Sequence, residues 1–144
     1  MGKRMGIAYL FDTNILIYTL NKEIPEKSSV QLKQIIDTSF NISAISKVEV
    51  LGWHHLKGKD LSIAQDFLEK ANVIEISSLI IDKAIVLRQK ARIKTPDAII
   101  AATALCNDLT LITRNTKDFT SLQELVVFNP FLDLMGKNNL LPGS

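Results

Sequence analysis

Acidic and amide side chains occur at four places in the sequence, each close to a predicted strand or helix boundary. Asp12 directly follows the apolar run 7–11, and Glu49 lies one to two turns into the helix expected after a second strand. Asn115 follows a late strand, whereas Asp97 begins an apolar helix without a strand directly before it. Because ligands of open α/β sheets bind beyond the carboxyl ends of the strands, these side chains are candidates for one shared site.

Each acidic residue also has a purely structural explanation. Asp is a preferred helix cap, so Asp12 taken alone is better explained as a cap. Asp97 follows a Thr-Pro pair at a helix start, where a carboxylate complements the helix dipole. Glu49 has a solvated helix face as its alternative, but its neighbours are apolar. They favour a desolvated Glu49, and such a carboxylate needs a cation.

The helix that Asp97 begins is apolar almost all round over residues 98–105, which predicts that it is buried in the domain centre. Carboxylates that converge at one end of a sheet repel one another unless cations neutralise them or protons bind. The candidate ligands are hard oxygens, and His54 and His55 lack the spacing of a zinc pair. This donor set favours Mg²⁺ or Mn²⁺ over Zn²⁺ and suits phosphoryl chemistry.

Strand and helix patterns alternate along the chain. Strands are expected over residues 7–11, 40–42, 73–76, 109–113 and 125–128. Helices are expected over residues 15–20, 25–38, 43–58, 61–71, 79–92 and 96–107, with Gly58 as the stop of the third helix. The alternation predicts an α/β fold in which helices cover both faces of a mostly parallel central sheet of about 4–5 strands.

Composition sets the outer bounds. The 144 residues, 47% of them hydrophobic, predict a single domain over 1–144, with residues 1–4 or 1–5 as a candidate extension because Met5 could be the native start. A net charge of +2 does not identify a polyanion binder by itself. The single Cys106 excludes an intramolecular disulfide and predicts a reducing compartment, hence the cytoplasm. No membrane span or signal peptide is recognised.

Four segments together resemble the motifs of PIN-domain nucleases. They are LFDTN (10–14), SAISKVEVLG (43–52), TPDAIIAATA (95–104) and TRNTKDF (113–119). They are most similar to the VapC-type toxins of bacterial toxin–antitoxin pairs. The motifs occur in the family's order, and the resemblance covers nearly the whole chain up to residue 130. It implies a PIN-like three-layer fold.

By this resemblance, Asp12, Glu49 and Asp97 are metal-binding carboxylates, with Asp12 at the centre. The chain departs from the pattern at the fourth position, where many relatives have Asp directly after Thr-Arg and this sequence has Asn115. An amide ligates through its carbonyl oxygen or holds a water but adds no charge, so one or two bound ions stay open. Asp118 is the candidate substitute, with a turn or capping residue as its alternative.

Other polar residues of the motifs are candidates for supporting roles. Asn14 is placed to orient Asp12, and Thr13 or Ser46 to donate to a ligand or to a phosphate oxygen, although helix capping explains all three equally well. Arg114 is a candidate bidentate donor to the substrate phosphate, with a surface salt bridge as its alternative.

A basic run lies just upstream of Asp97. Arg88, Lys90, Arg92 and Lys94 form two pairs at four-residue spacing, which on a helix would follow a phosphate backbone. A solvated helix face is the alternative explanation. Residues 129–144 are apolar for a chain end and are expected to bind the domain, a second protomer or an antitoxin peptide.

The resemblance implies an endoribonuclease that leaves a 5′-phosphate, a protein antitoxin and a homodimer. A metal-activated water would attack the phosphodiester in line, without a protein nucleophile. A PIN-like module that binds RNA or protein without cutting is the first alternative, motivated by Asn115. An aspartate-based phosphotransfer domain is the second, but it calls for a Lys after a late strand, and residues 113–115 have none.

Overall fold

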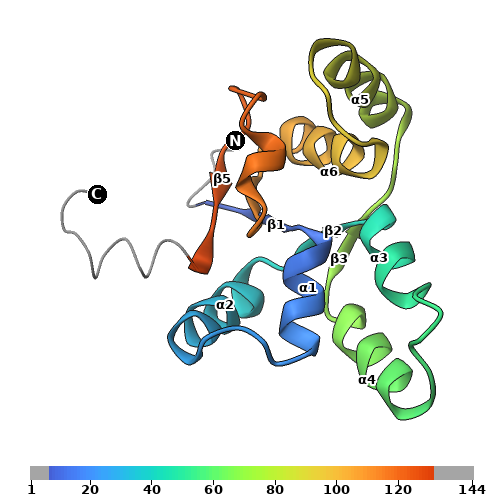
Figure 1. Ribbon diagram of the computed structural model, residues 1–144, viewed down its shortest axis with the longest axis vertical. Coiled ribbons are helices and arrows are strands. Elements are labelled where there is room, and N and C mark those ends of the chain that lie inside the picture. Colours follow the sequence, from blue (N-terminus) through green and yellow to red (C-terminus); the bar gives the residue numbers. More distant parts are fainter. Residues whose placement is uncertain (1–6, 132–144) are drawn as a thin grey trace.

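A five-stranded sheet forms the centre of the protein in the computed structural model, which describes residues 7–131 (Figure 1). Every strand pair is parallel, and the strand order is β3-β2-β1-β4-β5. The strands are β1 (Tyr9–Phe11), β2 (Asn41–Ser43), β3 (Asn72–Ile74), β4 (Thr110–Ile112) and β5 (Val127–Phe128). Because β1 lies between β2 and β4, the side chains that follow these three strands meet at one edge of the sheet.

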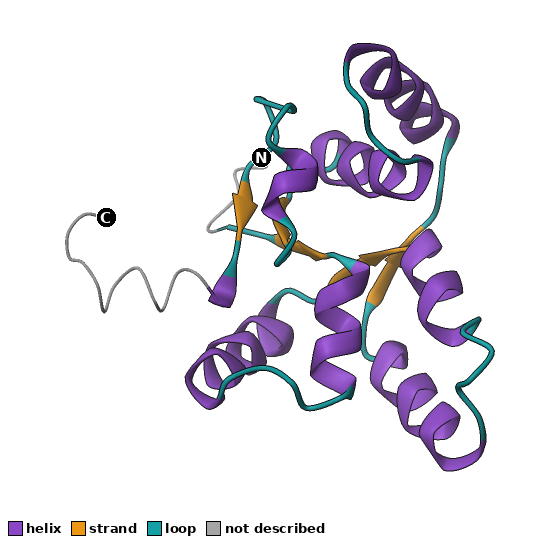
Figure 2. Cartoon of the chain, in the orientation of Figure 1, coloured by secondary structure: helices purple, strands orange, loops and turns teal. Residues whose placement is uncertain are grey.

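Helices cover both faces of the sheet, with α1, α2 and α4 on one side and α5 and α6 on the other (Figure 2). The helices are α1 (Thr13–Leu20), α2 (Glu26–Thr38), α3 (Ala44–Leu51), α4 (Gly58–Glu69), α5 (Ser78–Lys90) and α6 (Thr95–Cys106), and a 3-10 helix η1 spans Thr116–Phe119. This arrangement confirms the predicted three-layer α/β fold. Over residues 7–131, no helix has the length and apolar character that crossing a membrane requires.

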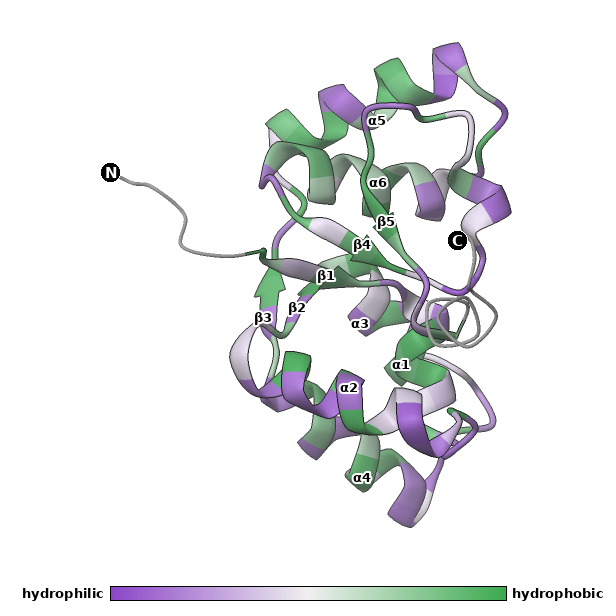
Figure 3. Cartoon of the chain, turned by 90° about the vertical axis from the view of Figure 1, so that its left-hand side faces the viewer, coloured by the Kyte–Doolittle hydropathy of each residue, from purple (hydrophilic) through white to green (hydrophobic). Residues whose placement is uncertain are grey.

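Two hydrophobic cores lie on the two faces of the sheet. Figure 3 shows the sheet lying between the two layers of helices. Leu10 and Leu111 pack toward α5 and α6, whereas Phe11 and Ile112 pack toward α1, α2 and α4. Successive side chains of a strand point to opposite faces, and both faces are covered by helices. Neighbouring residues of β1 and β4 are therefore apolar on both faces, as in Leu10-Phe11 and Leu111-Ile112.

Local sequence explains where several helices begin. The Ser43 hydroxyl accepts a hydrogen bond from the Ile45 amide at the start of α3, and the Ser77 hydroxyl accepts one from the Ile80 amide at the start of α5. Helix α6 is buried along most of its length and packs against α5, which confirms the expectation of a central apolar helix.

The prediction that Gly58 stops the third helix is wrong. Helix α3 already ends at Leu51 with Gly52 as its cap, and Gly58 instead begins α4 with a positive φ of 58°. A Cβ at Gly52 would lie 2.5 Å from the Val48 carbonyl oxygen, so this close approach of the chain requires glycine. Helix α3 therefore ends at Gly52, where the close approach requires glycine, and not at Gly58, which is six residues later.

The end of the described chain packs onto the α1–α2 side. Phe128 and Phe131 contact the core on that face, and the Ser28 hydroxyl of α2 donates to the Pro130 carbonyl oxygen at 3.2 Å. The predicted apolar tail, residues 129–144, thus binds the domain as far as residue 131. Its later residues and the candidate N-terminal extension lie outside the described residues.

Candidate active site

Asp12 lies at the carboxyl end of β1, where it is 3% exposed and caps α1. Its Oδ1 accepts a hydrogen bond from the Thr13 amide at 2.8 Å. Its Oδ2 accepts from the Asn14 amide nitrogen Nδ2 at 2.9 Å and from the Thr113 hydroxyl at 2.7 Å. Asp12 therefore caps α1 through one oxygen, as its capping explanation predicts, while its other oxygen accepts from Asn14, the contact that an orienting role requires.

Burial raises the pKa of Asp12 from 3.8 to about 6. The hydrogen bonds from Thr113 and Thr13 lower this pKa, and the negative charges of Asp97 and Glu49 raise it. The structure thus places Asp97 and Glu49 close enough to Asp12 for their charges to disfavour its ionisation, although the three residues come from distant parts of the sequence.

A chain of hydroxyl groups joins α1 to α3 beside Asp12. The Thr13 hydroxyl donates to Glu49 Oε1 at 2.7 Å and lies 2.8 Å from the Ser46 hydroxyl. A threonine hydroxyl has a single proton, and Thr13 donates it in the hydrogen bond to Glu49. Ser46 must therefore be the donor in its hydrogen bond with Thr13. The pair thus orients the Glu49 carboxylate in the structure.

The expectation that Glu49 is desolvated by its apolar neighbours is wrong. Glu49 is exposed, and Val48 beside it is 66% exposed. Helix α3 turns Val50 toward the α1 side of the sheet and Ile45 toward α6, whereas residues 47–49 face solvent. Apolar neighbours in the sequence do not surround a helical side chain, because successive helical residues point in different directions.

Asp97 lies half-buried in the first turn of α6. Burial raises the pKa of its carboxyl above the usual value, the charges of Asp118 and Glu49 raise it further, and Lys94 lowers it. Asp97 is therefore electrostatically linked to the predicted fourth position as well as to Glu49. The structure thus brings Glu49 and Asp118 toward the start of α6, where Asp97 lies.

The fourth corner of the site is a turn that holds Asn115 and Asp118. Asn115 is exposed and precedes η1, its backbone amide donates to the Thr113 hydroxyl at 3.0 Å, and its carbonyl accepts from the Asp118 amide at 3.1 Å. Asp118 is also exposed and acts on the pKa of Asp97. Asp118 thus lies in the 3-10 turn before Phe119, as its turn alternative expects, and its charge also acts on Asp97.

Thr113 is a site residue to which the sequence analysis assigned no role. It is completely buried at the end of β4, donates to Asp12 and accepts from the Asn115 amide. The register of the sheet pairs Phe11 with Ile112, so the next residue of each strand lies beside the other. The sequence signal that could have identified Thr113 is its position as a polar residue directly after a predicted buried strand.

Arg114 is held by aromatic rings. Its guanidinium lies 5.2 Å from the centre of the Tyr18 ring and 4.5 Å from that of Phe131, and the two rings meet edge to face at 5.7 Å. Within residues 7–131 its guanidinium makes no salt bridge, and these two rings are its contacts there. The arrangement links the end of β4 to α1 and to the end of the described chain.

The basic run does not form one helical face, contrary to the prediction. Helix α5 ends at Lys90, and Ala91 is extended, so Arg92 and Lys94 lie in the connection to α6. Ile93 is buried, which draws this connection onto the core and ends the helix before the spacing can continue. Of the basic run, Lys94 has an electrostatic effect on a site carboxylate, because its charge lowers the pKa of Asp97.

The donor set of the site fits a hydrated magnesium or manganese ion. Among residues 7–131, no three His, Cys, Asp or Glu side chains lie together as ready ligands of one ion. Mg²⁺ usually keeps several waters and binds through one or two carboxylates, so Asp12 as a direct ligand, with Glu49 and Asp97 reached through waters, would meet that requirement. The Asn14 Oδ1 atom is buried without a hydrogen-bond partner, and a water would satisfy this acceptor.

A family model described as the PIN domain matches residues 9–125 of the sequence. The chain belongs to the PIN domain family. This PIN domain also resembles a chain of a toxin–antitoxin complex from Klebsiella pneumoniae, with 35% identity over 86% of this chain and 98% of that chain and a TM-score of 0.67. The comparison with curated proteins found no match.

Two further solved structures share the fold of this PIN domain. VapBC2 from Rickettsia felis, bound to a DNA fragment from its promoter, is 26% identical over 85% of this chain and 98% of that chain, with a TM-score of 0.73. DNA-bound VapBC from Salmonella typhimurium has a TM-score of 0.75 at 19% identity, over 87% of this chain and 99% of that chain. The sequence-based assignment to the VapC-type PIN domains is thereby confirmed.

Proposed function

We propose that this PIN domain is a Mg²⁺- or Mn²⁺-dependent endoribonuclease, the toxin of a VapBC-type toxin–antitoxin pair acting in the cytoplasm. One observation carries the nuclease proposal: the charges of Asp97 and Glu49 act on the buried Asp12 at the carboxyl edge of the sheet. Such mutual repulsion is relieved when a cation binds. PIN domains are generally nucleases, which agrees with this reading of the site.

Some side chains of the site would bind the ion, and others orient these ligands by hydrogen bonds. Asp12 is the central ligand, and Thr113 and Asn14 hold its Oδ2 in place by hydrogen bonds. Thr13 holds Glu49 in the same way. A divalent ion bound here supplies an activated water and stabilises charge on the phosphate oxygens.

The remaining acidic and basic candidates have supporting roles in this proposal. Asp97 and Asp118 add negative charge that would hold further ligand waters of one or two ions, and Asn115 contributes an uncharged amide. Lys94, Arg92 and Arg114 are the proposed contacts to the phosphates of RNA, a role that their exposure permits. Phosphate contacts of this kind position a strand without reading its sequence.

A protein antitoxin is the proposed partner, and a homodimer the proposed assembly. The resemblance to a toxin–antitoxin complex supports the first. Beside Glu49, a groove of about 350 Å³ between α1 and α3 is lined by Ile17 and Trp53, which are 40% and 55% exposed. An exposed apolar surface at a site suits a protein partner that would block access to it.

Cleavage of an unstructured RNA by the purified protein tests the nuclease proposal. We expect cleavage with Mn²⁺, none with EDTA, and at least about a hundredfold loss in Asp12→Asn, because that change removes the charge of the central ligand. Cleavage that persists in Asp12→Asn or in EDTA would exclude this site as its source.

A PIN domain that binds RNA without cutting it is the second candidate. The amide at Asn115 and the dispersed carboxylates favour it, because both lower the affinity for a second ion. Binding of the same RNA in Mn²⁺ without any cleavage, by protein of confirmed folding, would support this alternative over the nuclease.

A further inference from the structure

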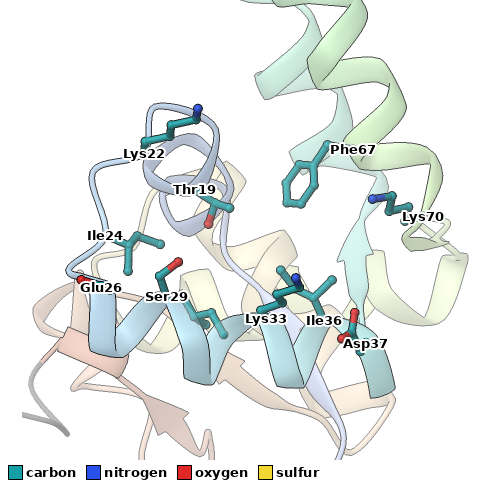
Figure 4. Close-up of a pocket in the computed structure, with 11 residues that line it drawn as sticks. Thr19, Lys22, Ile24, Glu26, Ser29, Lys33, Ile36, Asp37, Phe67 and Lys70 are labelled. Atoms are coloured by element: carbon teal, nitrogen blue, oxygen red, sulfur yellow. The ribbon is translucent and has the colours of Figure 1, made fainter.

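A second cavity lies away from the carboxylates, between the end of α1, helix α2 and helix α4 (Figure 4). Its volume is about 580 Å³, within the range of small-molecule sites. None of the candidate active-site residues lines it. Helix α1 has eight residues and begins at the active site, so its far end, where the cavity lies, is about 12 Å away along the helix axis.

The cavity wall combines apolar and hydroxyl-bearing side chains. Leu32, Ile36 and Phe67 provide apolar surface from α2 and α4. Thr19 and Ser29 provide hydroxyls, and the Thr19 proton is already donated to the Ile15 carbonyl, so this hydroxyl is left as an acceptor. A ligand of this cavity therefore has an apolar or planar part together with hydrogen-bonding groups.

Three lysines from separate segments also line the cavity. They are Lys22 after α1, Lys33 on α2 and Lys70 at the end of α4, and Figure 4 shows them around its rim. Within the described part of the chain, none of them makes an ion pair or a side-chain hydrogen bond, whereas Lys83 elsewhere pairs with Glu124 at 2.8 Å.

Two acidic residues share the same cavity wall. Glu26 lies in the first turn of α2 and Asp37 near its last, at opposite ends of the helix. Glu26 there complements the positive end of the helix dipole. The lysines outnumber these acids, and they come from three sides of the cavity, which favours an anionic ligand over a cationic one.

Lys22 has a backbone conformation that a lysine adopts only with strain. Its φ is 57°, and the Glu23 amide donates to the Tyr18 carbonyl at 2.9 Å while the Lys22 amide donates to the Thr19 carbonyl at 3.1 Å. These bonds define the helix C-terminal motif in which glycine is normally found. Strained residues of this kind concentrate at functional sites, and here the residue adds a cation to the cavity.

We propose that this cavity binds a nucleotide, either free or at the end of an RNA. The phosphate would lie among Lys22, Lys33 and Lys70, whose compact ammonium groups suit it. The base would stack on Phe67, because base stacking on an aromatic side chain tolerates any base. The Ser29 hydroxyl would face the ribose. Inorganic phosphate alone leaves the apolar wall of a 580 Å³ cavity uncovered, so a nucleotide is the better match.

Titration with adenosine 5′-monophosphate in EDTA, followed by amide NMR, tests this site without involving RNA cleavage. We expect saturable shifts at residues 19–22 and around Lys33 and Lys70, and at least about tenfold weaker binding in the double variant Lys33→Gln/Lys70→Gln. The matched control is Lys27→Gln, a lysine of α2 that does not line the cavity, and its affinity should stay within twofold of the unmodified protein.

The Lys22→Gly variant separates the ligand contact from folding. It should raise the melting temperature, because glycine adopts the positive φ without strain, and at the same time weaken binding. A variant that is both more stable and a poorer binder cannot be explained by damage to the fold. Unchanged affinity in Lys22→Gly would exclude that lysine from the site and contradict the proposed phosphate position.

A second titration distinguishes the two sources of the nucleotide. A short 5′-phosphorylated oligoribonucleotide is added to Asp12→Asn protein, which tests an RNA end, whereas adenosine 5′-monophosphate tests a free nucleotide. Saturable binding of either that is lost in Lys33→Gln/Lys70→Gln supports the site. Absence of both, equal weakening in Lys27→Gln, or adenosine binding as tightly as its monophosphate would overturn it, whatever the cleavage assay shows.

Discussion

At the scale of single residues, Asp12 combines two conflicting demands. Its burial at the end of β1 disfavours its charge, while donors from Thr13, Asn14 and Thr113 favour it. A cation would resolve this conflict by pairing with the charge, so the cost of the buried carboxylate is offset when the ion binds. An ion at the proposed site would therefore stabilise the folded protein.

The raised pKa of Asp12 predicts how stability depends on pH in EDTA. The folded protein holds a proton up to a pH of about 6, whereas the unfolded chain releases it near 3.8. The free energy of unfolding should therefore fall as pH rises from about 4 to about 6, by at most about 3 kcal/mol, and then level off. Asp97, whose pKa is also raised, contributes in the same direction.

Urea unfolding at pH 4.5 and pH 7 measures this dependence. In Asp12→Asn the difference between the two pH values should shrink, because the titrating group is gone. An undiminished difference in that variant would show that other groups cause it.

Replacing Thr113 with valine tests the residue that orients Asp12. Thr113→Val keeps the shape but removes the donor to Asp12, so we expect activity to fall and the pKa of Asp12 to rise further, moving the acid limb of the activity profile to higher pH. The loss of a buried hydrogen bond should cost about 1–2 kcal/mol in unfolding free energy.

A matched control for this change is Thr103→Val. Thr103 is equally buried, but its hydroxyl donates to the Ile99 carbonyl within α6, away from the carboxylates. It should change stability without moving the pH profile. If both variants moved the profile alike, the orienting role of Thr113 would be excluded.

At the scale of secondary-structure elements, the turn after β4 connects the candidate site to the rest of the fold. The turn after β4 brings Asp118 toward Asp97, and its first residue, Arg114, is packed between Tyr18 of α1 and Phe131. The position of this loop thus depends on α1 and on the end of the chain. Changes in that aromatic contact are expected to reach the site through the loop.

Arg114→Lys tests the aromatic contact. A lysine keeps the charge but loses the planar group that stacks on both rings, so stability should fall by no more than about 1 kcal/mol at this exposed position. RNA binding by the Asp12→Asn protein should weaken when Arg114→Lys is added, as measured by fluorescence anisotropy. Binding equal to that of Asp12→Asn alone would remove Arg114 from the RNA contacts.

The two glycines that flank the α3–α4 connection should respond differently to alanine. At Gly52 the added Cβ would lie 2.5 Å from the Val48 carbonyl oxygen, whereas at Gly58 nothing lies within 4 Å and only the positive φ opposes the change. We expect Gly58→Ala to cost about 1 kcal/mol and Gly52→Ala more. Thermal unfolding compares the two, and a larger loss in Gly58→Ala would contradict the close approach at Gly52.

At the scale of the whole molecule, the parallel sheet gathers residues from both halves of the chain at one edge. The helix layers on its two faces have separate cores, and the carboxylates belong to β1, α3, α6 and η1. A ligand that bridges these elements would bind only the folded state and would stabilise the protein as a unit.

Metal addition should therefore raise the melting temperature of the EDTA-treated protein. At a hundredfold excess over the dissociation constant, one bound ion adds about 2.7 kcal/mol to the free energy of unfolding. A thermal shift assay with Mn²⁺ measures this, and Ca²⁺ and Mg²⁺ serve as comparisons. The shift should disappear in Asp12→Asn, and an equal shift in that variant would place the ion elsewhere.

Local patterns in the sequence were sufficient for much of this architecture. Apolar runs and helical spacing are properties of neighbouring residues, so the alternation that produces the α/β sheet could be predicted without tertiary information. The motifs around Asp12, Glu49 and Asp97, through their resemblance to those of PIN domains, likewise pointed to carboxylates whose charges act on one another in the structure.

The tertiary structure alone decided which distant groups meet. Thr113 binds Asp12 because β4 pairs with β1, and Glu49 is exposed because α3 turns Val50 to the core and leaves Glu49 on the solvent side. The basic run is broken because Ile93 is buried. The lysine-lined cavity likewise joins Lys22 and Lys70, which are far apart in the sequence. Such meetings depend on strand order and packing, and local residue patterns do not contain either.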